Sequence, residues 1–253
     1  MGVKMKEYKI DLHIHTNVNP HAFSTLEENI SAAAKKGMEV IAITNHGPAL
    51  QDTPHWWHLV NIAILPEIID GVRVVKGVDA NILDTNGKLD INQRVYDHIE
   101  LVLAGFHVVD EYGAIDDIEK NTTAILSLIK KQKADIIVHL GNPIFPVDYK
   151  RIVKIAKENK VALEVNNTSL GTITRVGSRK NCKTMLELAK EERCFIALGT
   201  DAHYSGHIGE FQRAIELLNE VDYPEELIIN SSKEAFEEFL KLRQELRSKK
   251  VDS

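Results

Sequence analysis

The sequence has few cysteines, no long apolar run and no excess of basic residues, and each absence excludes a class of protein. Cys182 and Cys194 are the only cysteines among 253 residues and form no C-x-x-C motif, so neither a disulfide framework nor a zinc–thiolate site is indicated. No apolar run approaches the length of a membrane helix, and the N-terminal MGVKMKEYK lacks the apolar core of a signal peptide. We therefore expect a cytoplasmic protein with no membrane partner.

The charge balance also limits the partners. The chain has 31 basic and 37 acidic residues, a formal net charge of −6, and no basic stripe, which disfavours binding of a long nucleic acid. With 43% hydrophobic residues it can bury a large core. Because no low-complexity linker, repeat or Gly/Ser-rich hinge interrupts it, we predict a single domain over residues 1–253, with a helical tail at about 208–253 packed on it.

Short apolar segments alternate with longer helical patterns along the chain. The predicted strands are Lys9–His15, Val40–His46, Val72–Ile82, Leu101–His107, Asp135–Leu140, Ala162–Asn167 and Phe195–His203. The predicted helices are Leu26–Lys36, His58–Ile69, Ile118–Lys131, Asp148–Asn159 and Lys180–Glu191, followed by at least two in the tail, one of them containing Phe236–Leu246. This alternation implies parallel strands, and seven of them favour a closed barrel, with an open sheet as the alternative.

The first strand contains a His-x-His pattern. Alternation along a strand puts one set of side chains, Ile10, Leu12 and Ile14, on one face and another, Asp11, His13 and His15, on the other. Two residues at i and i+2 lie roughly 6.6 Å apart by rise, so both imidazoles can converge on one metal ion. Taken alone, the pattern also fits a polar strand face with chance histidines.

Other predicted strands end in polar residues as well. The set at the carboxyl ends is His13, His15, His46, Asp79, His107, His139, Asp201 and His203. In parallel α/β barrels this end carries the active site. So many histidines and aspartates, each ending an apolar strand, are hard to explain as core packing. Histidine and carboxylate without thiolate suit zinc, manganese or iron, and we predict a multinuclear metal site rather than a polar network without metal.

Six segments in order carry a resemblance to a known family. They are DLHIHT from Asp11, ITNHGP from Ile43, GVDAN from Gly77, AGFH from Ala104, HLGNP from His139 and GTDAH from Gly199. Together they resemble the PHP (polymerase and histidinol phosphatase) superfamily, most of all its stand-alone metal-dependent phosphatase branch, from Asp11 to about Phe211. The resemblance implies a distorted (βα)7 barrel of parallel strands with the active site at their carboxyl ends.

The resemblance also implies a cofactor, about three divalent metal ions per chain, with zinc first and manganese or iron as alternatives. One ion would take His13, His15, Asp79 and Asp201. A second would take His107 and His139 and share Asp79 as a bridge, and a third would take His21, His46 and His203. His21 lies in the loop Asn17–Ser24 and is assigned by the resemblance alone.

Two positions depart from the family's pattern. The bridging residue is usually glutamate but is Asp79 here, which is shorter by about 1.5 Å. The family's Asp-His pair is Asn45-His46, so the charge at the first position is lost while an acceptor remains. Neither change removes a histidine ligand.

The predicted function is a phosphoric ester hydrolase that cleaves a small phosphorylated substrate. A phosphate monoester held across the metals would be attacked by a metal-bound hydroxide, with catalytic roles for Asp79, Asp201 and His203. The alternatives are a phosphodiesterase or exonuclease on short nucleic acid, a metal barrel hydrolysing C–N bonds, and a metal-binding barrel without turnover. The C–N hydrolases usually add a carboxylated lysine, and no lysine here ends a strand.

Substrate contacts are predicted in the segment from Asn166 to Asn181. It follows a strand and leads into a helix, and a Gly-Ser turn with arginines at a helix N-terminus is a reasonable phosphate-binding loop. We expect Arg175, Ser178 and Arg179 to contact substrate there, with Asn142, beside His139, orienting the site. A solvated basic capping segment is the alternative.

Overall fold

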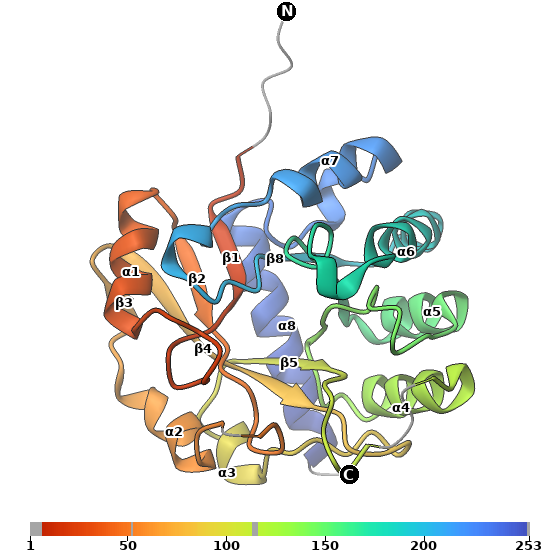
Figure 1. The fold of residues 1–253 in the computed structure, drawn as a ribbon, viewed down its shortest axis with the longest axis horizontal. Helices are drawn as coiled ribbons and strands as arrows, with labels where there is room; N and C mark the ends of the chain where they lie inside the picture. Colours follow the sequence, from red (N-terminus) through yellow and green to blue (C-terminus); the bar gives the residue numbers. More distant parts are fainter. Residues whose placement is uncertain (1–6, 52, 113–115, 252–253) are drawn as a thin grey trace, which may run out of the picture.

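The structure, a computed structural model, describes residues 7–51, 53–112 and 116–251. Its strands are β1 Ile10–Ile14, β2 Val40–Ile43, β3 Ile68–Ile69, β4 Val72–Asn81, β5 Leu101–Gly105, β6 Ile136–Ile137, β7 Ala162–Asn166 and β8 Ile196–Gly199. Its helices are α1 Leu26–Lys35, α2 Trp56–Asn61, α3 Gln93–Tyr96, α4 Ile118–Lys130, α5 Tyr149–Asn159, α6 Ser178–Glu192, α7 Gln212–Val221 and α8 Lys233–Val251. Figure 1 shows the helices arranged around the strands.

Seven of the described strands form a nearly closed parallel barrel. Their order is β1-β2-β4-β5-β6-β7-β8, and every pair in this path is parallel. The ring closes where β1 meets the residues after β8: the amide of His15 donates to the carbonyl of Ala202 at 2.9 Å, and Ile14 bridges the same residue. The predicted distorted (βα)7 barrel is therefore confirmed.

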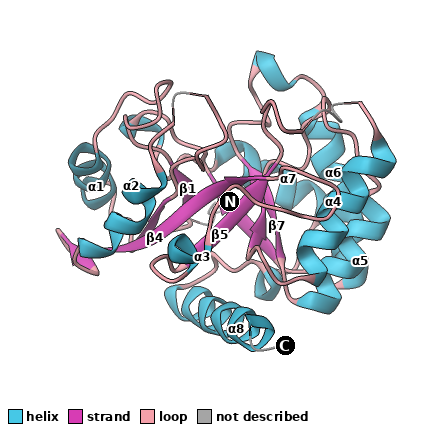
Figure 2. Ribbon diagram, turned by 90° about the horizontal axis from the view of Figure 1, so that it is seen from below, coloured by secondary structure: helices cyan, strands magenta, loops and turns pink. Residues whose placement is uncertain are grey.

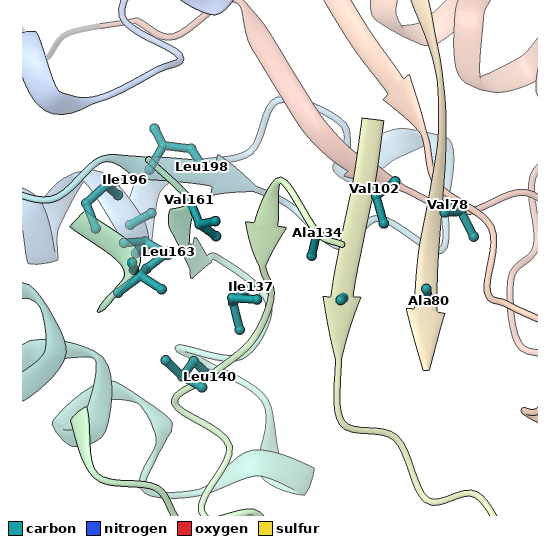
Figure 3. Close-up of a cluster of buried hydrophobic side chains, with 14 of the residues drawn as sticks. Val78, Ala80, Val102, Ala134, Ile137, Leu140, Val161, Leu163, Ile196 and Leu198 are labelled. Carbon is teal, nitrogen blue, oxygen red and sulfur yellow. The ribbon is translucent and has the colours of Figure 1, made fainter. Parts of the chain in front are cut away.

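The barrel has two apolar layers, one inside and one outside. The inner cluster contains Ile10, Leu12, Val40, Ala42, Val75, Leu101, Leu103, Ile136, Val138, Ala162 and Ala197 from the strands, joined by Phe236, Phe239 and Leu240 of α8. The outer cluster packs strands against helices, and Figure 3 shows part of it. Helix α8 lies across one end of the strands (Figure 2), so it covers the amino end of the barrel and leaves the carboxyl end open.

The predicted helix His58–Ile69 is wrong in its second half. Helix α2 ends at Asn61, and β3 follows and pairs antiparallel with β4. Pro66 holds Leu65 in an extended conformation, with φ −67° and ψ 138°, which stops a helix there. Asp70 and Gly71 both have positive φ, 49° and 79°, which is the backbone of a tight two-residue hairpin turn.

The predicted alternation along β1 is also interrupted. Ile10 and Leu12 belong to the inner cluster, but Ile14 belongs to the outer one. The register between β1 and β2 shifts between Asp11 and Ile14, as in a β-bulge, which re-aims the side chains that follow. Leucine and isoleucine thereby fill the barrel below, while His13 and His15 lie at its open end.

The tail forms α7 and α8, and α8 contains the predicted Phe236–Leu246. Over the described part of the chain, no helix is both long and apolar enough to cross a membrane. The single domain and the cytoplasmic location stay predictions.

Candidate active site

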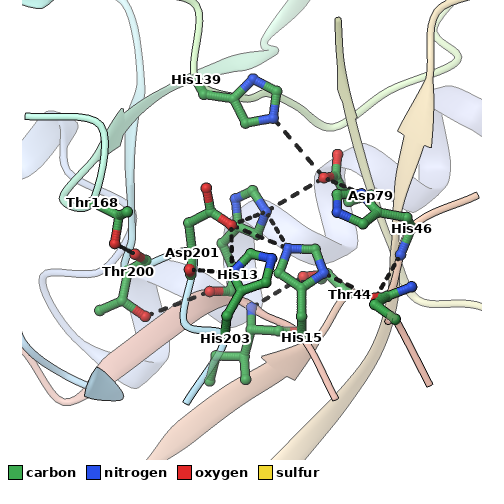
Figure 4. A network of polar contacts seen from close by, with 12 residues as sticks. His13, His15, Thr44, His46, Asp79, His139, Thr168, Thr200, Asp201 and His203 are labelled. Atoms are coloured by element: carbon green, nitrogen blue, oxygen red, sulfur yellow. Dashed lines mark hydrogen bonds and ion pairs between the residues drawn. The ribbon is translucent and has the colours of Figure 1, made fainter. Parts of the chain in front are cut away.

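The predicted metal ligands meet at the open end of the barrel. His13 comes from β1 and Asp79 from β4. The others follow the ends of β1, β2, β5, β6 and β8 within four residues: His15, His46, His107, His139, Asp201 and His203. Figure 4 shows most of these side chains pointing toward one another. All but His107 and His203 are buried, and those two are partly so. His21, from the loop after β1, lies at the mouth with its ring centroid 4.6 Å from that of His203.

The hydrogen bonds of His13 and His15 hold their Nδ1 atoms and direct their Nε2 atoms into the cluster. Nδ1 of His13 lies 2.7 Å from the carboxylate of Glu164, and Nδ1 of His15 lies 3.2 Å from the amide oxygen of Asn19. Because both oxygens are acceptors, each Nδ1 must carry the hydrogen. When both imidazoles are neutral, as metal ligands must be, the two Nε2 atoms face each other at 3.1 Å with only lone pairs between them.

Carboxylates converge on the same point. Oδ1 of Asp201 lies 3.2 Å from Nε2 of His15, and Oδ2 of Asp79 lies 3.5 Å from Nε2 of His13. Both carboxylate oxygens of Asp79 are buried and have no hydrogen-bond partner among the described residues. Lone pairs and negative charge packed this closely repel one another unless a proton or a metal cation lies between them. The donor set therefore fits a divalent metal.

The remaining histidines extend the cluster on both sides of Asp79. Its Oδ2 lies 3.0 Å from Nδ1 of His46 and 3.1 Å from Nε2 of His107, which in turn lies 3.1 Å from Nε2 of His139. His203 turns Nδ1 to the carbonyl of Asp201 and keeps a buried Nε2 with no partner. Three groups of ligand atoms lie close enough to hold an ion: His15, His46 and His203; His13, His15 and Asp79; and His46, Asp79 and His107.

Burial keeps several of these histidines neutral. It lowers the pKa of His15, His46 and His203 to about 4 each. Burial alone would raise the pKa of Asp79, but the neighbouring histidines, His107 first, hold it well below its usual range. His13 differs: burial alone would lower its pKa, but Glu164 and Asp201 raise it well above its ordinary value, so a metal ion that binds here displaces a proton from His13.

Two glycines make room for the site. A Cβ on Gly199 would lie 2.1 Å from Oε1 of Glu164, which reaches from β7 past β8 to His13 on β1. A Cβ on Gly105 would lie 2.5 Å from the ring of His139. Each glycine therefore allows a polar side chain to cross a neighbouring strand.

His139 and Asp201 both have left-handed backbone, with φ 37° and 56°. Such conformations cost roughly 1–3 kcal/mol in non-glycine residues and cluster at functional sites. The turn at His139 directs its amide to Oε2 of Glu164 at 2.7 Å.

Asn45 positions the segment after β1. Its amide oxygen accepts hydrogen bonds from the backbone N–H of Thr16 at 2.8 Å and from the Thr16 hydroxyl at 3.2 Å. Its amide nitrogen lies 3.3 Å from Nε2 of His58 and donates to it. An ionised aspartate here could keep this contact only with the other tautomer of His58, in which Nε2 carries the hydrogen and donates.

Two of the four predicted substrate contacts line a cleft beside the cluster. Arg175 donates to the Ser169 hydroxyl at 2.7 Å and to Oδ2 of Asp201 at 3.2 Å. Asn142 lies in the same cleft, with its backbone N–H bonded to the carbonyl of His139. Arg175 therefore borders the cluster through Asp201.

Ser178 and Arg179 lie elsewhere. Ser178 is buried at the start of α6, and Arg179 forms an ion pair with Glu220 of α7 at 2.7 Å. Neither lines the cleft, and their contact with substrate stays a prediction.

The sequence did not indicate several residues of the site. Asn19 orients His15 from a loop, where no strand-end pattern distinguishes it. The cleft, of about 490 Å³, is also lined by Leu50, Gln51, Phe106, Val108, Ile144, Phe145, Thr168, Thr172 and Thr174. Apolar residues after a strand look like core in the sequence, so only the fold brings them to the site.

Comparisons with known proteins identify the family of the chain. The family model for the PHP domain matches residues 11–170. A protein of Shewanella loihica named "Probable phosphatase" is 41% identical over 237 residues, which cover 94% of this chain and 95% of that protein. "Probable phosphatase YcdX" of Escherichia coli O81 is 38% identical, covering 93% of this chain and 95% of that protein.

A solved structure shares the fold. Histidinol phosphate phosphatase of Lactococcus lactis, complexed with zinc, L-histidinol and phosphate, has a TM-score of 0.59 at 16% identity, covering 86% of this chain and 95% of that one. The chain belongs to the PHP domain family. The predicted family is thereby confirmed, and the names of the relatives support the predicted phosphatase class.

Proposed function

We propose that the protein is a metal-dependent phosphatase that hydrolyses phosphate monoesters of small molecules at a three-metal site. The observation that carries the proposal is the convergence of the Nε2 atoms of His13 and His15, 3.1 Å apart, beside the carboxylates of Asp79 and Asp201. With both imidazoles neutral, as metal ligands must be, this arrangement is favourable only with a cation between the ligands. Phosphatase chemistry follows from the relatives, which are named probable phosphatases.

The ligands keep the assignment predicted from the family. One ion would be held by His13, His15, Asp79 and Asp201, a second by His107, His139 and Asp79, and a third by His21, His46 and His203. Two of the three close groups contain Asp79, so its short side chain still reaches ligands of two ions, although the groups also join His15 to His46 and His203 and His46 to His107. Zinc is the first candidate, as in the Lactococcus lactis structure, and manganese and iron use the same donors.

Divalent ions in such a site neutralise phosphoryl oxygens and lower the pKa of water toward neutrality. We assign substrate binding and proton transfer to residues of the chain. Arg175, next to Asp201, is placed to bind a phosphoryl oxygen on the cleft side. Asp201 is placed to accept the proton of the attacking water, and His203, partly exposed at the mouth, completes the catalytic set with Asp79. With Arg175 as the only cation in the described cleft lining, a short phosphate ester fits better than a nucleic-acid strand.

Metal content and hydrolysis test this proposal together. Protein purified without a histidine tag or chelator should contain near three equivalents of zinc, manganese or iron and hydrolyse phosphate monoesters. His15→Ala should lower the rate by at least about two orders of magnitude, because it removes a buried ligand. The matched control is His98→Ala, an exposed histidine bonded to the carbonyl of Arg94, which should leave the rate unchanged.

Other metal contents or rates would lead to different conclusions. One or two equivalents of metal would locate the deficit at the ions that share Asp79. No bound metal after adding it back, or unchanged hydrolysis by His15→Ala, contradicts the proposal.

A further inference from the structure

The cleft beside the cluster has one apolar wall. It is formed by loops after β2, β5 and β6 through Leu50, Phe106, Val108, Ile144 and Phe145. Phe106 and Phe145 are buried and stack at 5.2 Å between ring centroids, with Tyr112 packed on Phe106 at 4.9 Å. Val108 and Ile144 line the same cleft and are 65% and 43% exposed.

The rest of the cleft is almost uncharged. Three threonines, Thr168, Thr172 and Thr174, and the amides of Gln51 and Asn142 complete its lining beyond the histidines. Arg175 is the one cation and Asp201 the one carboxylate among the described lining residues, and these two contact each other. After Arg175 binds one phosphoryl group, the described lining has no further cation for a second phosphate, and its one carboxylate, Asp201, is already engaged by Arg175 and the metal cluster.

We infer that this wall is a subsite for the alcohol portion of the substrate, and that it selects phosphate monoesters whose alcohol is apolar and uncharged. The inference rests on the proposed function and names its substrate class. Exposed apolar side chains gathered beside convergent polar groups are typical of ligand pockets. A charged alcohol would leave its charge without a partner against an apolar wall, which is costly.

Binding of three phosphonates to the metal-loaded protein tests the inference, because their P–C bond is not hydrolysed. Methylphosphonate reports the shared head group, benzylphosphonate adds an apolar ring, and 2-aminoethylphosphonate adds an ammonium group. By calorimetry, benzylphosphonate should bind at least about tenfold more tightly than methylphosphonate, and 2-aminoethylphosphonate no more tightly.

Two variants locate the effect. Val108→Ser and Ile144→Ser should each reduce the advantage of benzylphosphonate several-fold and leave methylphosphonate binding unchanged. The control is Ile68→Ser, since Ile68 on β3 is 58% exposed but pairs with Arg73 near the start of β4, away from the cleft. It should change none of the three affinities.

The outcomes separate this inference from the proposed function. Equal binding of the three phosphonates, no binding of benzylphosphonate, or tightest binding of 2-aminoethylphosphonate overturns the subsite, even if monoesters are hydrolysed. Preferential binding of benzylphosphonate that depends on Val108 and Ile144 supports the subsite. If that preference is found but no monoester is hydrolysed, the proposed function fails while the subsite stands.

Discussion

Glu164 connects three parts of the metal cluster at the level of single atoms. Its Oε1 accepts the Nδ1 hydrogen of His13 at 2.7 Å, and its Oε2 accepts from the amide of His139 at 2.7 Å and from Nδ2 of Asn166 at 3.1 Å. Asn166 also donates to Asp201 at 3.3 Å. Hydrogen-bond partners of this kind do not bind the metal themselves, but they fix the tautomer and orientation of the side chains that do.

We predict that Glu164→Gln weakens metal binding by about 10–100-fold while the chain still folds. Glutamine has the same length, but its amide nitrogen cannot accept a hydrogen bond. Either the Nδ1 hydrogen of His13 or the backbone amide of His139 therefore loses its acceptor, and that histidine loses its fixed orientation. Competition with a chromophoric chelator measures the affinity, and circular dichroism of the metal-free forms reports folding. Glu119→Gln, at an exposed residue paired with Arg151, is the matched control. Equal affinities in the two variants would refute this positioning role.

The sequence predicted the ligands better than their partners. His13, His139 and Asp201 were recognisable because each ends or follows an apolar strand. Glu164 lies on a predicted strand, but nothing in the sequence indicates that Gly199 leaves room for its side chain to reach His13. Contacts between residues 151 positions apart follow from barrel closure, which local patterns do not encode.

Acid should destabilise the metal-free protein through its buried histidines. Burial lowers the pKa of His203 to about 4, whereas in the unfolded chain it titrates near its ordinary value, about 6.5. The unfolded state then binds more protons as the pH falls, so this stability is complete above pH 6.5 and lost toward pH 4. Asp11 has the opposite effect on stability. Burial raises the pKa of its carboxyl to about 6, so at this residue the folded state binds the proton more readily than the unfolded state and acid is stabilising.

A variant isolates this contribution. Between pH 6.5 and 5, His203→Gln should lose less thermal stability than the unmodified protein, by about 2–4 °C in Tm, for a difference of roughly 1 kcal/mol. Chelator-treated samples followed by circular dichroism give the two Tm values at each pH. An identical pH dependence in both proteins would show that His203 is not held neutral by the fold. His98→Gln, at the exposed histidine, should match the unmodified protein.

At the scale of elements, the sequence predicted regular strands and helices and missed their interruptions. The hairpin at Asp70-Gly71 carries a clear turn signal, but a helical apolar pattern running across Pro66 outweighed it. The bulge in β1 has no signal at all, because Leu12 and Ile14 fit either face. Yet the bulge allows Ile10 and Leu12 to fill the barrel while His13 reaches the site.

At the scale of the molecule, α8 ties the barrel together from the end opposite the site. Arg243 is fully buried, and its guanidinium donates to the carbonyls of Ala134 and Asn159, to Gln132 and to the buried carboxylate of Asp135. Removing one partner of a buried ion pair leaves the other charge uncompensated. This contact supports the prediction of a single domain, since it joins α8 to the residues before β6.

We therefore predict that Arg243→Met destabilises the whole molecule by about 3–5 kcal/mol, and that the site end unfolds with it. In urea, fluorescence of Trp56 and Trp57, on α2 beside the cluster, should change at the same midpoint as the circular dichroism of all helices. Lys241→Met, on the exposed side of α8, should leave the midpoint unchanged. If the variant lost helix signal at a lower urea concentration than the tryptophan signal, α8 would fold as a separate unit. The site would then depend on the barrel alone, because the inner apolar cluster could persist without Phe236 and Phe239.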